Sequence, residues 1–194
     1  MQNTKTRELV LYALFTALTL LLGLTPIGFI YFPFASVTIM HIPVIVAGYL
    51  LGVKGGAFFG FIFGLTSLIQ CFMAPDAFAM IVLGTETGFG LYNVLLILVV
   101  LFLPRVLTGV FSALVYKAFS RKKPGNVFAL GSSAIIGSLT NTVLFLGALY
   151  VFAYNQSAAA FGLAGGFTSL EFIQVLLGIV SFNGLLEAAA ALII

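Results

Sequence analysis

Charged side chains are scarce in this sequence. Only 7% of its 194 residues are Asp, Glu, Lys or Arg, and 62% are hydrophobic, whereas a soluble domain carries about 25% charged residues. The mean hydropathy is +1.24. These values exclude a soluble enzyme and predict an all-α integral membrane protein, in which each crossing needs about 20 apolar residues.

Cysteine and histidine occur once each, as Cys71 and His41. A single cysteine excludes an internal disulfide framework, and one histidine leaves no cluster for a metal. The sequence also lacks the G-x-x-x-x-G-K-[ST] phosphate loop and the G-x-S-x-G nucleophile elbow, the motifs of one route to ATP hydrolysis and of serine hydrolases. We therefore expect no enzyme activity, no cofactor and no metal. The net charge of +3 is too small and too scattered to indicate nucleic-acid binding.

The apolar stretches predict one membrane domain, residues 1–194, with six transmembrane helices. Their approximate ranges are 8–24, 41–53, 56–72, 91–119, 127–152 and 170–194. The fourth would extend about 43 Å as one straight helix, more than the roughly 30 Å of the hydrocarbon core. Because Pro104 interrupts it, we expect either a kink at residue 104 or a surface segment followed by a crossing that begins at Arg105. Residues 28–40 are aromatic and contain Pro33, which predicts a partly extended outer loop.

The basic residues indicate the orientation in the membrane. If the N-terminus is inside, the predicted inner segments hold seven of the eight basic residues, namely Lys5, Arg7, Lys54, Lys117, Arg121, Lys122 and Lys123. The predicted outer loops hold none of them and contain Asp76, Glu86 and Glu171. Since Lys and Arg concentrate in cytoplasmic segments, both termini are predicted to be cytoplasmic.

Two ionisable residues stand inside apolar stretches, Arg105 and Glu187. A charge within the membrane is costly, so each is expected to face a cavity or a partner. Helix rise puts Arg105 and Asn141 at similar heights in the outer half of the membrane, and Asn183 lies four residues from Glu187 on one helix face. These four side chains are predicted to converge on one polar pocket. The alternative is a buried Arg105–Glu187 ion pair, with the asparagines capping broken backbone.

The residue types of this predicted pocket favour an anionic, hydrogen-bonding small molecule. Arginine presents a planar fork suited to a carboxylate or phosphate, and amides orient hydroxyl and amide groups of a ligand. Asn93, near the outer surface, is a further candidate contact. His41 is another, although its place at the start of the second crossing also fits a helix-start role.

Small residues are regularly spaced on two of the predicted helices. A stripe with a spacing of four predicts close helix packing along the third crossing; its members are Gly52, Gly56, Gly60 and Gly64. Ala13 and Ala17 form an A-x-x-x-A pair on the first helix. Lys54 and the glycines that follow it predict a tight turn between the second and third crossings.

Several segments occur in a characteristic order: ALFTA at 13–17, TIMHIPVIVAGYLLGVKGGAFFGFIFGLTSLI at 38–69, LPRVLTG at 103–109, GSLTNT at 137–142 and NGLLEA at 183–188. Together they resemble the substrate-binding S component of energy-coupling factor vitamin transporters, over essentially the whole chain. The last three segments look most like the pantothenate-specific branch of that family.

This resemblance implies a bacterial cell-membrane protein that captures a vitamin at the outer face. It also implies association with a transmembrane coupling subunit and two ATP-binding subunits, and toppling in the membrane to release the vitamin inside. Ala13 and Ala17 match the family's docking surface for the coupling subunit, and residues 28–40 match the loop that covers the vitamin. For pantothenate, Arg105 would hold the carboxylate, while the hydroxyls and amide would contact Asn141, Asn183 and Glu187.

Three other functions fit the sequence. The chain would be an S component for another vitamin such as riboflavin if stacking aromatics dominate the pocket. It would be a self-contained secondary transporter if Glu187 couples uptake to protons. A structural or assembly protein of the membrane would bind no vitamin at all.

Overall fold

The computed structural model describes residues 4–25, 28–31, 36–75, 77–84, 90–120 and 127–160, together with the single positions 170, 174 and 178. Within this part of the chain, four helices are long and apolar enough to cross a membrane: Lys5–Leu24, His41–Met73, Leu91–Phe119 and Val127–Phe152. The predicted last crossing, residues 170–194, lies outside the described residues except for those three positions.

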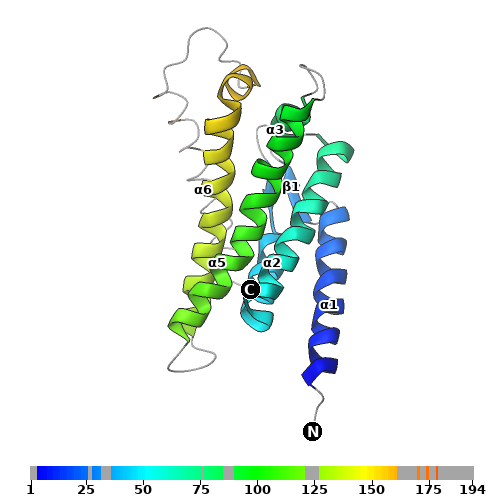
Figure 1. Cartoon of the computed structure of the whole chain (residues 1–194), viewed down its shortest axis with the longest axis vertical. Helices are drawn as coiled ribbons and strands as arrows, with labels where there is room; N and C mark the ends of the chain where they lie inside the picture. The colour runs from blue at the N-terminus through cyan, green and yellow to red at the C-terminus, as the bar shows by residue number, and fades with distance from the viewer. Residues whose placement is uncertain are drawn as a thin grey trace.

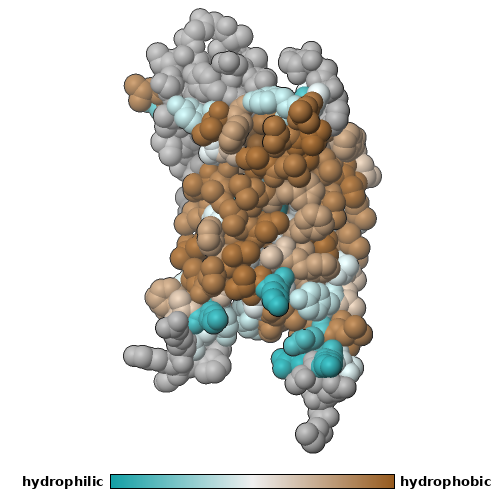
Figure 2. All heavy atoms as spheres, viewed as in Figure 1, coloured by the Kyte–Doolittle hydropathy of each residue, from teal (hydrophilic) through white to brown (hydrophobic). Residues whose placement is uncertain are grey.

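The long helices stand side by side in the order α1, α2, α5 and α6 (Figure 1). Their bounds are Thr4–Leu24, His41–Met73, Leu103–Phe119 and Val127–Ala160. An apolar surface covers the middle of the bundle, and hydrophilic residues gather toward one end (Figure 2). This distribution fits a bundle whose middle faces lipid, because a lipid environment sets no penalty on exposed apolar side chains.

Helix α2 reverses direction at Gly52, whose backbone has φ 73 and ψ −167. The hydroxyl of Thr66 donates to the Sδ atom of Met40 at 3.8 Å, although 26 residues of straight helix would separate them by about 39 Å. The two halves of α2 therefore lie antiparallel. A positive φ is accessible to glycine at no steric cost, so the reversal lies at Gly52 and not at the turn expected from Lys54 and its neighbouring glycines.

Short elements come directly before and after α2 in the chain. Strands β1 (Phe29–Tyr31) and β2 (Ser36–Thr38) pair antiparallel, with Phe29 opposite Thr38. In the described ranges the fold is therefore helical except for one hairpin, where the sequence predicted a partly extended loop. Aromatic and β-branched residues favour this pairing. Helix α3 (Ala77–Leu83) follows α2.

The helical stretch 91–119 is continuous and changes its winding in the middle. It consists of α4 (Leu91–Leu96), the π-helix η2 (Ile97–Phe102) and α5. The N–H of Leu103 bonds the carbonyl of Leu98, five residues back. The expected irregularity thus begins before residue 104, because Pro104 has no N–H and the turn that precedes it widens.

Glycines bring α2 and α5 into backbone contact. A methyl group added at Gly56 would overlap the backbone of Gly109, and one added at Gly60 would overlap the backbone of Arg105. Gly64 meets the ring of Phe102 in the same way. Three members of the predicted glycine stripe therefore serve close packing. The prediction was wrong for Gly52, where an added Cβ would meet nothing within 4 Å.

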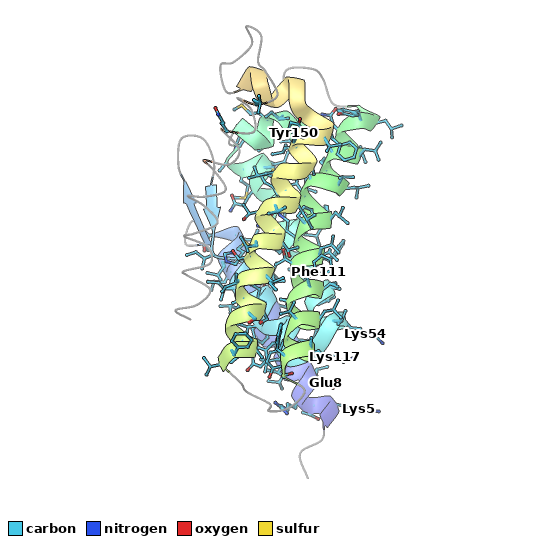
Figure 3. All side chains as sticks on the ribbon, turned by 90° about the vertical axis from the view of Figure 1, so that its left-hand side faces the viewer. Lys5, Glu8, Lys54, Phe111, Lys117 and Tyr150 are labelled. Carbon is cyan, nitrogen blue, oxygen red and sulfur yellow. The ribbon has the colours of Figure 1, made fainter. Side chains whose placement is uncertain are left out.

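Charged side chains among the labelled residues of Figure 3 gather at one end of the bundle. Lys5, Glu8, Lys54 and Lys117 lie at this end, and Tyr150 lies at the opposite end. The N-terminal turn of α1, the reversal of α2 and the C-terminal turn of α5 therefore share one end, which we call the basic end.

Candidate functional site

Arg105 is buried in the centre of the bundle, with 7% of its surface exposed. Its Nη1 donates to the carbonyl oxygen of Val100 at 2.8 Å. In a regular α-helix that carbonyl would accept from the N–H of residue 104, but residue 104 is a proline without one. The proline therefore frees a backbone acceptor, and the neighbouring arginine uses it to fix its guanidinium.

Two aromatic rings lie against the guanidinium of Arg105. Its Cζ atom lies 4.6 Å from the ring centroid of Phe145 on α6 and 5.6 Å from that of Phe63 on α2. Both distances are within the range of cation–π attraction. The guanidinium thus contacts the backbone carbonyl of Val100 and the ring faces of Phe63 and Phe145, which belong to three separate segments of the chain.

Asn141 lies on the face of α6 that packs against α5. Gly137, one turn before it, would place an added Cβ 3.2 Å from Ser112 on α5, and Phe145, one turn after it, contacts Arg105. Residues four apart share a helix face, so Asn141 lies within about one turn of the arginine. It is 6% exposed, and among the described residues its Oδ1 has no hydrogen-bond partner.

Asn93 and His41 have their own surroundings in the structure. Asn93 Oδ1 accepts from the N–H of Gly90 at 3.1 Å, and its Nδ2 donates to the carbonyl of Val82 at 3.3 Å. These bonds tie the start of α4 to α3. His41 begins α2 and is fully buried at 0% exposure, so its side chain is not at the surface of the bundle.

The remaining predicted contacts, Asn183 and Glu187, lie outside the described residues. Their convergence with Arg105 and Asn141 stays a prediction.

Sequence reasoning missed the aromatic partners of Arg105. Phe63 and Phe145 are two of 21 phenylalanines, and no pattern separates them from those that face lipid. The adjacency of Pro104 and Arg105 was the one usable signal, because a proline inside a helix frees a carbonyl four residues back that a neighbouring donor can reach.

Helix α1 has a different environment. Its Ala13 and Ala17 are exposed, and so are several large apolar side chains of the same helix: Leu9, Val10, Leu14, Leu18, Leu20, Leu21 and Leu24. The opposite side packs on α2 through Phe15, whose ring meets Phe59 at 5.8 Å. The predicted docking pair therefore lies on a face that the described part of the chain leaves open.

The arrangement in the centre can hold an anion that also forms hydrogen bonds. A guanidinium in an apolar surrounding attracts a carboxylate more strongly than it would in water, because the effective dielectric constant is lower. The Oδ1 atom of Asn141, on the same face of α6 as the Phe145 that contacts Arg105, can accept from a hydroxyl or an amide N–H.

Comparisons with known proteins agree with this chemistry. A family model for the substrate-specific component of ECF transporters matches residues 7–194. The pantothenic acid transporter PanT of Lactococcus lactis subsp. cremoris (strain MG1363) is 30% identical over 205 residues, which cover 100% of this chain and 92% of that protein. The pantothenate transporter PanT of Leuconostoc mesenteroides subsp. mesenteroides is 29% identical over 202 residues, with coverages of 100% and 91%.

Proposed function

Because this chain belongs to the family of substrate-specific components of ECF transporters, we propose that it binds pantothenate and delivers it to an energy-coupling module. It is a multi-pass protein of the bacterial membrane and a transporter subunit, not an enzyme. Two relatives that match its whole length are pantothenate transporters by name. The observation on this chain that supports the same ligand is the guanidinium of Arg105, buried between two aromatic rings.

In this proposal each group of the site has a defined role. Pantothenate carries one carboxylate, two hydroxyls and one amide. Arg105 binds the carboxylate, and the rings of Phe63 and Phe145 exclude water from that contact. Asn141 accepts a hydrogen bond from a hydroxyl or from the amide. Asn183 and Glu187 would complete the pocket from the last helix.

Asn93, near the end of the bundle opposite the basic end, and His41, which follows the Met40 that contacts Thr66, are retained as further candidate contacts. Both sides of the Asn93 amide already bond backbone groups. Its contribution is therefore expected to be smaller than that of Asn141.

The proposal includes six crossings with both termini in the cytoplasm. The two halves of α2 count as two crossings, and residues 170–194 supply the last. The shared position of Lys5, Lys54 and Lys117 at the basic end (Figure 3) supports a cytoplasmic placement of that end, because basic residues are retained on the cytoplasmic side.

Substrate-specific components work together with an energy-coupling module. We propose that this chain docks on a transmembrane coupling subunit, joined to two ATP-binding subunits, through the open face of α1 around Ala13 and Ala17. Small side chains on such a face let a second helix approach closely in lipid, where packing drives association. No nucleic acid takes part, and the remaining surface contacts membrane lipid.

Calorimetry of the purified chain against a panel of B vitamins tests the proposed ligand. We expect pantothenate to bind more tightly than riboflavin, folate or thiamine. Binding of riboflavin without binding of pantothenate would overturn the ligand and leave the family unchanged. Uptake into vesicles by this chain alone, without ATP or other subunits, would instead favour proton coupling through Glu187.

A further inference from the structure

Ser67 is a buried polar residue to which neither the sequence nor the comparisons assign a role. It lies on the second half of α2 and is 6% exposed. Among the described residues its Oγ has no hydrogen-bond partner. Its neighbour Thr66, in contrast, donates to the carbonyl of Phe63 at 2.9 Å and so satisfies its hydroxyl within its own helix. A buried hydroxyl is normally hydrogen-bonded, so we expect the hydroxyl of Ser67 to bond a group other than the described residues.

The register between α2 and α5 places Ser67 near the guanidinium of Arg105. Gly56 contacts Gly109, Gly60 contacts Arg105 and Gly64 contacts Phe102, so each turn up α2 corresponds to about one turn back along α5 and η2. The arginine reaches back to the carbonyl of Val100. The guanidinium therefore lies close to the level of Ser67 along the helix axes.

Ser67 also continues the line of residues on α2 that faces the arginine. Phe63, one turn before it, presents its ring to the Cζ atom of Arg105 at 5.6 Å. Side chains four residues apart on a helix lie on the same face, one above the other. Ser67 thus lies one helical turn beyond Phe63, whose ring contacts the guanidinium of Arg105.

We propose that the hydroxyl of Ser67 is a ligand-binding group that donates a hydrogen bond to the carboxylate held by Arg105. This inference rests on the proposed function and adds to it a contact from the wall formed by α2, opposite the α6 wall that carries Asn141. The guanidinium can only donate and the hydroxyl of Ser67 is able to donate, so together they suit the oxygens of a carboxylate. The site selects for the acid end of the vitamin.

The test compares pantothenate with pantothenol, in which a neutral alcohol replaces the carboxylate. We expect Ser67→Ala to raise the Kd for pantothenate about tenfold, the effect of one hydrogen bond to a charged group. The Kd for pantothenol should rise much less, because a hydrogen bond to a neutral alcohol is weaker. The melting temperature of the ligand-free protein should stay the same or rise, because the substitution removes a buried polar atom. Ser133→Ala is the matched control, since its Oγ donates to the carbonyl of Leu130 at 2.9 Å; it should bind pantothenate as the wild type does.

A second pair of variants keeps the test independent of side-chain volume. Thr and Val have the same shape, so Ser67→Thr should bind pantothenate more tightly than Ser67→Val. Equal binding by wild type and Ser67→Ala would overturn this inference and leave the proposed function standing. Equal weakening for pantothenate and pantothenol would overturn the assignment to the carboxylate. A wild-type protein that binds no pantothenate would overturn both the inference and the proposed function.

Discussion

The centre of the bundle and its α1 edge are built in opposite ways. In the centre, glycines bring α2 and α5 into backbone contact, and a buried charged side chain contacts a carbonyl and two aromatic rings. At the edge, 17% of the apolar window of α1 is buried, compared with 56% for α2. The exposed face of α1 carries Ala13 and Ala17 among large apolar residues.

This difference suggests that the centre recognises the ligand and that the α1 edge docks on another subunit. A fixed charge in a dry interior can recognise a small anion, because little reorganisation is needed when the ligand arrives. An open face with small residues is suited to packing against a helix of another subunit. In lipid, helices associate through close van der Waals packing, and small side chains permit it. We therefore expect substitutions in the centre to change folding or binding, and substitutions at the edge to change only assembly.

The largest effect is expected from a bulky side chain at the α2–α5 contact. Gly56→Leu would force the two backbones apart and should lower the free energy of unfolding by about 3 kcal/mol or more. Thermal unfolding in detergent measures this change. Gly147→Leu makes the same substitution on α6, where an added Cβ meets nothing within 4 Å, and it should melt as the wild type does. Equal melting of the two variants would contradict the proposed packing.

The next effect concerns the edge. Ala13→Trp or Ala17→Trp should abolish ATP-dependent uptake in vesicles that contain the partner subunits, because the coupling subunit could no longer approach α1. Pantothenate binding to the isolated variants should stay intact. Val143→Trp, on the exposed side of α6, is the control and should leave uptake unchanged. Full uptake by both alanine variants would exclude α1 as the docking face.

Substitutions of Arg105 test whether the centre of the bundle binds the ligand. Arg105→Ala should raise the Kd for pantothenate about 100-fold, since a desolvated charged contact is lost. Arg105→Lys keeps the charge without the planar fork and should fall between the alanine variant and the wild type. Calorimetry on variants with a cooperative melting transition measures the change. If a folded Arg105→Ala variant binds normally, the arginine serves only packing or an internal ion pair.

The smallest effect is expected at Asn141. Asn141→Ala should weaken pantothenate binding about fivefold, the typical effect of one hydrogen bond between neutral groups. The neighbouring Thr140 donates to the carbonyl of Ile136 within its own helix, so Thr140→Ala should bind as the wild type does. If the two variants have the same affinity, Asn141 lies outside the ligand site.

The sequence predicted the long helices and the importance of Arg105, but not the position of the reversal or the partners of the arginine. The apolar runs predicted the long helices, and the single charge inside one of them singled out Arg105. Both predictions follow from the free-energy cost of placing polar groups in lipid. The reversal at Gly52 was placed a few residues too late, since several nearby glycines could supply a positive φ. The partners of Arg105 depend on the register between helices, which residue types alone do not determine. Phe63, Phe145 and Ser67 therefore emerged only from the structure.

The most direct measurement identifies, by mass spectrometry, the small molecule that copurifies with the protein. We expect pantothenate on the wild-type chain and little or none on Arg105→Ala purified in parallel. A different vitamin on the wild type, or equal amounts of pantothenate on both proteins, would contradict the proposal that the buried guanidinium selects a carboxylate-bearing vitamin.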